Sequence, residues 1–349
     1  MHGKMRALVK TDPAPGAQLL TVDIPPVGPR DALIKVKATS ICGTDLHIYR
    51  WDQWAQTRLH PPRRFGHELA GEVVEVGSAV TLVRPGDYVS ADSHIACGVC
   101  YQCRTGRRHI CANLSILGVD VDGCFSDYAV IPEASLWKNS PTLRPEVACV
   151  QDPLGNAVYA TLVEPVSGRS MAVFGCGPVG LFAVGVARAS GARPIFAVDV
   201  NEFRMGLAKQ MGATHLVRAG DENVVDTILR ETGGLGVDVV LEMSGAHQAI
   251  QQGFQVLTKG GRFTAFGIPE EPIPYFDLAN QVIFKGARVI GINGREMFQT
   301  WYEMADLLNS GALDPSPVIT HAFTLEEYQA AFDLLLSPSR QCGKVVLIP

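Results

Sequence analysis

The sequence has little charge and few aromatic side chains. Charged residues make up 19% and aromatic residues 7% of the chain, and 30 Lys and Arg are set against 35 Asp and Glu, which gives a net charge of −5. Cationic patches attract proteins to nucleic-acid phosphates and to anionic membrane surfaces. We therefore predict that an acidic chain without a run of basic residues has neither a nucleic acid nor a membrane as its partner.

A long, uninterrupted apolar segment is also missing. The most apolar stretch, residues 171–187, is short for a bilayer and contains Gly175, Gly177, Pro178 and Gly180, so it reads as a buried strand followed by a helix. The N-terminal MHGKMRALVK has a charged start and lacks the apolar core of a secretion signal. We therefore expect a cytoplasmic protein whose nine cysteines stay reduced and free to bind metal.

The pattern of apolar residues divides the 349-residue chain into parts of different character. Up to about residue 155, short β-branched runs are separated by Gly and Pro, as in residues 32–38, 71–76 and 88–91, which predicts an antiparallel or barrel-like domain. From Ser170 onward, apolar strands alternate with helices, which predicts a doubly wound parallel sheet. The predicted strands are 171–174, 194–198, 215–217, 237–242 and 261–266, and the predicted helices are 179–190, 202–211, 222–232 and 246–256.

The tail is predicted to contain helices over 298–310 and 323–336 and a strand over 343–348. Because the predicted sheet is complete by about Gly291, we assign the tail to the first domain. The predicted domains are therefore 1–155, 156–295 and a C-terminal return over 296–349.

Four cysteines lie close together in the chain, at Cys97, Cys100, Cys103 and Cys111. Thiolates at this spacing are typical of a closed structural zinc site with four sulfur ligands. Such a site leaves no coordination position for a substrate, so any catalytic metal must bind elsewhere. The alternative, four buried free thiols, does not account for the spacing.

A glycine motif indicates a dinucleotide site. Gly175, Gly177 and Gly180, with Val179 between the last two, fit G-x-G-x-x-G between a predicted strand and a predicted helix. Asp199 ends the next predicted strand, where a carboxylate binds the ribose hydroxyls of NAD and repels the 2′-phosphate of NADP. Arg204 could stack on the adenine or contact the ribose. The alternative is a glycine-rich turn followed by a helix-capping aspartate.

A second group of ligand types precedes the cysteine cluster. Cys42, His67 and Glu68 supply a thiolate, an imidazole and a carboxylate, a mixed set typical of a zinc with an open coordination position. Spacing alone does not join them, because two separate pairs of such residues also occur in ordinary cores.

The order of these motifs resembles that of the medium-chain zinc-dependent alcohol dehydrogenases over essentially the whole chain. The resemblance rests on Cys42, Gly66-His67-Glu68, the four cysteines, the glycine motif and Asp199. Residues 42–49, 152–157 and 294–302 resemble in particular a branch of the family that oxidises an amino-acid alcohol.

The resemblance implies a chaperonin-10-like β-rich catalytic domain joined to a Rossmann domain, two zinc ions per chain and assembly into a homotetramer. It implies oxidation of L-threonine by NAD to 2-amino-3-oxobutanoate, with the catalytic zinc held by Cys42, His67 and Glu68. Thr44 and His47 would relay the proton, and Asp152 would aid proton transfer through a water or bind zinc directly. Cofactor contacts are implied at Phe266, Gly267, Ile268, Ile292 and Asn293, although relatives usually carry an aromatic residue at the position of Asn293.

Other functions remain open on sequence alone. A polyol dehydrogenase acting on sorbitol or butanediol would have the same fold and zinc sites. A more remote alternative is a non-catalytic zinc protein that binds nucleic acid through Arg104, Arg107 and Arg108. A threonine site needs a cation for the substrate carboxylate, for which Arg295 is a candidate, while the other interpretation of Arg295 is a residue that ties domains or subunits together.

Overall fold

The computed structural model describes residues 3–221 and 223–349, and these residues form two compact units. Unit 1 comprises Met1–Asp152 and Ile319–Pro349, and unit 2 comprises Pro153–Val318. Residues 296–318, which the sequence analysis placed with the C-terminal return, therefore lie in unit 2. None of the described helices is long and apolar enough to cross a membrane.

Unit 1 is built on a mostly antiparallel sheet. Its strands run in the order β10-β6-β5-β3-β18-β17, with β9 also paired to β3, and a smaller sheet has the order β2-β1-β4. Among the named strands of this unit, as far as the structure describes it, only the pair β17–β18 is parallel. The main strands are β1 Lys4–Lys10, β2 Gln18–Asp23, β3 Asp31–Ser40, β4 Arg63–Arg64, β5 Glu68–Val76, β6 Tyr88–Ala91, β9 Tyr128–Pro132, β10 Leu136–Lys138, β17 Ile319–Thr324 and β18 Lys344–Ile348.

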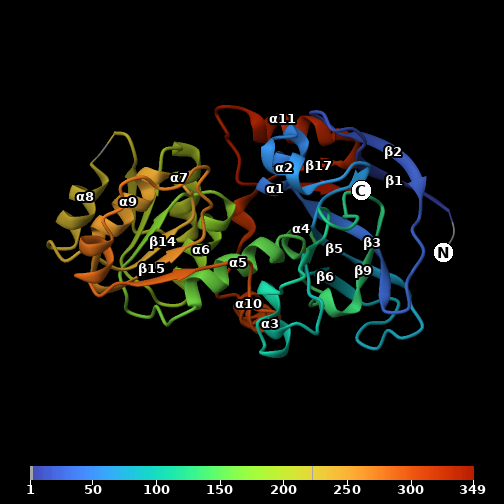
Figure 1. Ribbon diagram of the computed structural model, residues 1–349, viewed down its shortest axis with the longest axis horizontal. Helices are drawn as coiled ribbons and strands as arrows, with labels where there is room; N and C mark the ends of the chain where they lie inside the picture. The colour runs from blue at the N-terminus through green and yellow to red at the C-terminus, as the bar shows by residue number, and fades with distance from the viewer. Residues whose placement is uncertain (1–2, 222) are drawn as a thin grey trace. The chain divides into compact units, whose positions relative to one another are not determined.

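The C-terminal segment of unit 1 completes its core. In Figure 1 the red elements α11 (Tyr328–Leu336) and β17 lie beside the blue α1 (Gly43–Arg50) and α2 (Gln53–Arg58). Tyr49 of α1 stacks on Phe332 of α11, with ring centroids 4.2 Å apart, and both side chains are buried. Further short elements of unit 1 are α3 Tyr101–Arg104, α4 Pro145–Ala148, β7 His94–Ile95 and β8 Ser115–Ile116.

Unit 2 contains a six-stranded parallel sheet in the order β13-β12-β11-β14-β15-β16. This is the doubly wound order in which the direction of winding reverses next to the first strand, β11. The strands are β11 Met171–Phe174, β12 Ile195–Asp199, β13 His215–Arg218, β14 Val237–Glu242, β15 Leu257–Ala265 and β16 Arg288–Gly291. The helices are α5 Gln151–Leu162, α6 Pro178–Ala189, α7 Glu202–Met211, α8 Val224–Glu231, α9 His247–Val256 and α10 Gln299–Asn309.

Helices cover both faces of this sheet. Phe174 and Val198 pack in one cluster with Ile228 of α8 and Phe254 of α9. Because side chains alternate along a strand, Val173 faces the opposite side, where α6 and α7 pack against β11 and β12. Figure 1 shows this arrangement of sheet and helices. The fold class predicted from the sequence, a β-rich chaperonin-10-like domain plus a Rossmann sheet, is confirmed.

One predicted helix is wrong at its start. The sequence predicted a helix over 323–336, but Phe323 and Thr324 belong to β17, which pairs with β18 through a register running from Ile319↔Lys344 to Thr324↔Ile348. Thr324 then forms a capping box with Glu327 and caps a 3-10 turn over Leu325–Glu327, and α11 follows from Tyr328. The predicted helix over 222–232 begins at Glu222, which lies outside the described residues, and α8 is seen from Val224 onward.

Candidate functional site

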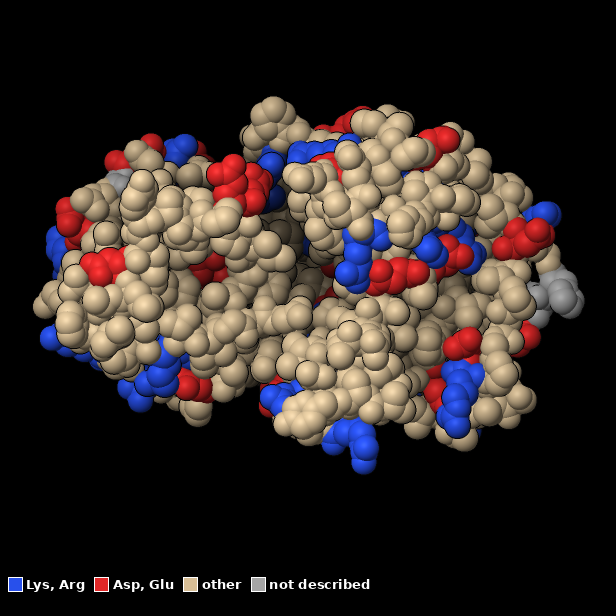
Figure 2. Space-filling view, in the orientation of Figure 1, with Lys and Arg blue, Asp and Glu red and all other residues tan. Residues whose placement is uncertain are grey.

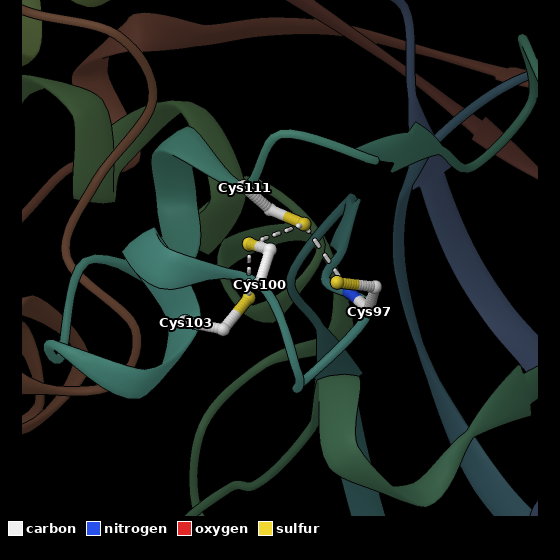
Figure 3. Close-up of side chains that lie close together, drawn as sticks. All are labelled: Cys97, Cys100, Cys103 and Cys111. Atoms are coloured by element: carbon white, nitrogen blue, oxygen red, sulfur yellow. Dashed lines mark hydrogen bonds between the residues drawn. The ribbon is translucent and has the colours of Figure 1, made fainter.

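The four clustered cysteines lie on a short loop with two sharp turns. Gly98 and Gly106 have φ values of +77° and +84°, which residues with a Cβ rarely adopt. The turns bring Cys97 and Cys111, at the ends of the loop, next to Cys100, which is the N-cap of α3, and Cys103 within α3. Figure 3 shows the four thiols pointing toward one another.

The sulfur geometry fits a tetrahedral zinc ion. The four ligand atoms lie within 4.8 Å of one another, and Cys100 Sγ is 3.4 Å from Cys103 Sγ and 3.7 Å from Cys111 Sγ. A tetrahedral zinc with Zn–S bonds of about 2.3 Å separates its sulfurs by about 3.8 Å. Backbone N–H groups of Val99 and Cys100 lower the pKa of Cys97 to about 6, which favours the thiolate that binds metal.

The visible face of the molecule carries both signs of charge. Figure 2 shows Lys and Arg interspersed with Asp and Glu over the visible face. On the loop, the Arg107 guanidinium lies over the Tyr101 ring, 5.6 Å from its centroid. Arg107 is thus engaged within the loop, as expected of an ordinary surface arginine.

A second group of donors assembles where β3, α1 and β5 meet. Cys42, His67 and Glu68 offer ligand atoms within 4.8 Å of one another. Cys42 is the N-cap of α1, while His67 and Glu68 lie at the start of β5. Gly66, with φ +90°, makes the entry to β5 possible, because a Cβ there would lie 2.4 Å from the Phe125 ring. A thiolate, an imidazole and a carboxylate in this arrangement suit zinc with an open coordination position.

His67 has a buried ring nitrogen that no hydrogen bond satisfies among the described residues. Its Nδ1 lies 3.5 Å from Oδ1 of Asp45, which is also buried without a hydrogen-bond partner in that part of the chain. Burial lowers the pKa of His67, but the Asp45 charge raises it, and the net pKa lies well above the ordinary value. Buried polar atoms left unpaired are rare in folded proteins, so this pair is consistent with a site arranged for a metal.

Glu68 is paired with a lysine that the sequence analysis missed. Lys344 Nζ, on β18, lies 2.8 Å from Oε1 and 2.5 Å from Oε2 of Glu68, and the Ser40 hydroxyl also donates to Oε2. The Lys344 and Glu68 side chains are 2% and 1% exposed. Burial lowers the pKa of Lys344, but the Glu68 and Cys42 charges raise it, with a net increase that keeps the ammonium charged.

The predicted relay residues lie on α1, next to Cys42. Thr44 and His47 are three residues apart on this helix and therefore share a face. Thr44 is half-buried, whereas the His47 side chain is 52% exposed. Their placement fits a path from the Cys42 group to solvent, and their roles stay predictions.

Asp152 is buried in unit 1 but does not join the Cys42 group. Its Oδ1 accepts a hydrogen bond from the backbone N–H of Ser93 at 2.8 Å. It is not among the donors that lie within 4.8 Å of one another in that group. The arrangement favours the water-mediated role over direct zinc binding, and neither role is tested.

The glycine motif of unit 2 forms the turn from β11 to α6. Gly175 has φ +97°, and a Cβ on Gly180 would lie 1.9 Å from the Gly175 carbonyl oxygen, so both positions require glycine. Gly177, the N-cap of α6, faces open space within 4 Å, which leaves the helix N-terminus free to approach a pyrophosphate. Val179 lies in the first turn of the same helix.

Asp199 ends β12 beside this turn. Its Oδ2 accepts the backbone N–H of Cys176 at 2.5 Å, and its Oδ1 accepts that of Asn201 at 2.8 Å. A carboxylate can accept about four hydrogen bonds, so Asp199 keeps capacity for ribose hydroxyls. Arg204, in the first turn of α7, is half-buried. Burial raises the pKa of the Cys176 thiol, and the Arg204 charge offsets only part of that increase.

The other predicted cofactor residues follow the carboxyl ends of neighbouring strands. Phe266 and Gly267 donate their N–H groups to the Glu242 carbonyl, and Ile292 donates to that of Ala265, all at 2.9–3.0 Å. In a parallel sheet these ends share one edge with the glycine turn, which is where dinucleotides bind. Ile268 is 87% exposed, and Asn293 follows Ile292 at the same edge.

Arg295 is an internal residue of unit 2. It is 1% exposed, its Nη1 donates to Asn156 Oδ1 at 2.8 Å, and its side chain packs against Gly155. These contacts tie residues 294–298 to α5. They give Arg295 a packing role within unit 2, and its two predicted roles, a ligand of the substrate carboxylate or a tie between domains or subunits, stay predictions.

Comparison with known proteins identifies the family. Residues 28–141 match the alcohol dehydrogenase GroES-like domain, and residues 178–310 match the zinc-binding dehydrogenase domain. The chain belongs to the zinc-dependent medium-chain alcohol dehydrogenases. Within that family, it is 49% identical to the L-threonine 3-dehydrogenase of Bacillus licheniformis over 349 residues, which cover all of both chains.

Solved structures agree with this assignment. An alcohol dehydrogenase of Escherichia coli, solved in complex with NADH, superposes with a TM-score of 0.91 at 26% identity, covering 99% of each chain. The 2R,3R-butanediol dehydrogenase of Bacillus subtilis gives 0.88 at 28% identity, also covering 99% of each chain. The fold is therefore shared with family members of different names.

Proposed function

We propose that this chain is an enzyme that oxidises the side-chain hydroxyl of L-threonine with NAD to give L-2-amino-3-oxobutanoate, as in threonine catabolism. The observation that carries the proposal is the 49% identity to an L-threonine 3-dehydrogenase along the entire chain. The Cys42, His67 and Glu68 group and the glycine turn with Asp199 supply the sites that such a reaction needs. In this proposal unit 1 is the catalytic zinc domain and unit 2 binds NAD.

The two groups of donor side chains support two zinc ions per chain. Cys42, His67 and Glu68 would hold the catalytic zinc, and Cys97, Cys100, Cys103 and Cys111 the structural one, two per chain. When bound, the catalytic zinc supplies Lewis acidity that lowers the pKa of the substrate hydroxyl, and NAD supplies the hydride acceptor.

Side chains of α1 would carry the proton of the substrate hydroxyl to solvent. The Thr44 hydroxyl accepts the proton that leaves the substrate hydroxyl and passes its own proton to the His47 ring. The exposed His47 then releases a proton to solvent. Lys344 and Ser40 hold the Glu68 carboxylate inside unit 1, which keeps its negative charge balanced.

A polyol or secondary-alcohol dehydrogenase is the second candidate, favoured by the likeness to the butanediol dehydrogenase. The test is an NAD-reduction assay with L-threonine, L-serine, sorbitol and 2,3-butanediol on one metal-analysed sample. We expect the highest kcat/KM with L-threonine. No measurable turnover of L-threonine, with turnover of a polyol, would transfer the assignment to the second candidate.

Asp199 gives a prediction about cofactor choice. Because a carboxylate repels the 2′-phosphate of NADP, the wild-type protein should strongly prefer NAD, and Asp199→Ala should reduce that preference. The measurement is kcat/KM for both cofactors. Asp238→Ala is a suitable control, because Asp238 binds Ser170 at the opposite, amino-terminal side of β11. Equal efficiency of the wild type with both cofactors would remove Asp199 as the selecting residue.

Assembly and location complete the proposal. We propose a homotetramer. Each unit exposes large apolar side chains, which often mark a protein–protein interface: Val99 and Tyr101 on the cysteine loop of unit 1, and Phe284 and Val289 at or near the edge strand β16 of unit 2. Light scattering on the purified protein measures the assembly. We propose the cytoplasm as its location, because nine free thiols suit a reducing compartment.

A further inference from the structure

The turn between α1 and α2 brings an aspartate against the proposed relay histidine. Trp51 ends α1 in the left-handed conformation, with φ 57°, and reverses the chain. The next residue, Asp52, donates its backbone N–H to the His47 carbonyl at 3.4 Å. Its side chain returns to the ring, where His47 Nδ1 and Asp52 Oδ2 form a hydrogen bond.

The Asp52 carboxylate is held in place from its other side. It is the N-cap of α2, and Oδ1 accepts the backbone N–H of Ala55 at 3.2 Å. Partial burial raises the pKa of Asp52, but the hydrogen bonds from His47 and Ala55 lower it, with a net decrease. Asp52 is therefore ionised at neutral pH and can only accept hydrogen bonds.

An accepting carboxylate decides which nitrogen of His47 carries the proton. The hydrogen bond requires Nδ1–H, so the neutral ring keeps its lone pair on Nε2. The Trp54 ring lies 5.9 Å from the His47 ring, centroid to centroid, and limits its rotation. Asp52 is the charged side chain that pairs with the His47 ring.

We propose that Asp52 is a positioning residue of the proton relay, which fixes His47 as the Nδ1–H tautomer and directs Nε2 to receive the proton. This inference rests on the proposed function. The substrate hydroxyl loses a proton to Thr44 Oγ1, whose own proton moves to His47 Nε2. The ring is then an imidazolium whose charge Asp52 balances, and Nε2 returns the proton to solvent while Asp52 stays ionised.

Asp52→Asn is the informative variant. Asparagine is as good an N-cap as aspartate, so α2 keeps its cap while the charge opposite His47 is lost. We expect kcat with L-threonine to fall about 10- to 100-fold, in the range of a weakened acid–base group, with little change in KM. The acid limb of the kcat–pH profile should move to lower pH, because the charge that favours the protonated ring is gone. Zinc content and Tm should match the wild type.

A second readout does not depend on turnover. Diethyl pyrocarbonate acylates neutral imidazole, so its rate of reaction at His47, followed over pH by peptide mass spectrometry, reports the titration of this ring. The midpoint should move to lower pH in Asp52→Asn. Arg58→Gln is the matched control. It removes the ion pair between Arg58, at the other end of α2, and Asp120, and it leaves the His47–Asp52 pair in place. The kcat–pH profile and the modification profile of this variant should both resemble those of the wild type.

The outcomes are separable. A fall in kcat with neither pH profile displaced would assign Asp52 to the architecture of α2 and overturn the proposal. A displaced modification profile with unchanged kcat would overturn its role in the relay. If the wild type does not oxidise L-threonine, the proposed function fails, and the modification profile still decides whether Asp52 controls His47.

Discussion

Replacing His47 with Asn is expected to lower kcat for L-threonine oxidation by roughly 10²- to 10⁴-fold, the usual contribution of a positioned acid–base group. His47 lies three residues from Thr44 on α1, and its side chain is 52% exposed, so it can exchange protons with solvent. Asparagine keeps a polar side chain but cannot be protonated near neutral pH. The same loss is expected for Thr44→Ala, which removes the hydroxyl between substrate and ring.

The controls separate chemistry from structure. Thr44→Ser keeps the hydroxyl and should retain most of the activity, whereas Thr44→Ala should not. His60→Asn removes another exposed histidine, from the loop after α2, and should leave kcat unchanged. Zinc content, measured by mass spectrometry, should equal that of the wild type in all of these variants. Wild-type turnover by His47→Asn and Thr44→Ala would remove both residues from the mechanism.

Mild chelation is expected to abolish activity before it unfolds the protein. Cys97, Cys100, Cys103 and Cys111 would bind a metal with four protein ligands, whereas the Cys42, His67 and Glu68 group would leave a position open to substrate. The metal of the second group should therefore be lost first. Cys42→Ser should accordingly lose about one zinc per chain and more than about 10³-fold in kcat/KM, since the Lewis acid is removed. Zinc release, activity and circular dichroism followed in one titration measure this order.

A buried cysteine outside both groups provides the control for this variant. Cys342 is 0% exposed and packs in the core of unit 1, so Cys342→Ala should cost stability but keep both metals and kcat. Chelation that removed both ions together would contradict the two-site assignment. So would full activity and an unchanged zinc content in Cys42→Ser.

Much of the fold was predictable because its signals are local. The helix predicted over 202–211 has the observed bounds, since Asn201 caps its start and Gly212, with φ 107°, ends it. The start of α11 was not predictable in the same way. Residues 323–327 have helical character, but β17 is fixed by pairing with β18, and the two strands are separated in the chain by the whole of α11. Tertiary pairing overrides local preference there.

In the candidate site, too, features with a local sequence signal were predictable, and features that depend on distant residues were not. The four cysteines are recognisable because all four lie within one short loop, and the glycine turn because it follows its strand directly. Lys344 pairs with Glu68 across 276 residues of sequence, and no spacing rule connects them. The available signal was a lysine within the apolar run 344–348, a strand whose other residues are all hydrophobic. A buried charge of that kind needs a partner.

The Lys344–Glu68 pair also bears on how the protein is made. Glu68 leaves the ribosome long before Lys344, because all of Pro153–Val318 is translated between the two parts of unit 1. Until β18 arrives, burying Glu68 would place an unbalanced carboxylate in the interior, which is costly. We therefore expect the N-terminal part to close around Cys42, His67 and Glu68 only after β18 has been translated. Unit 2 is a continuous segment that can fold before then, so we expect this group of donors to form last.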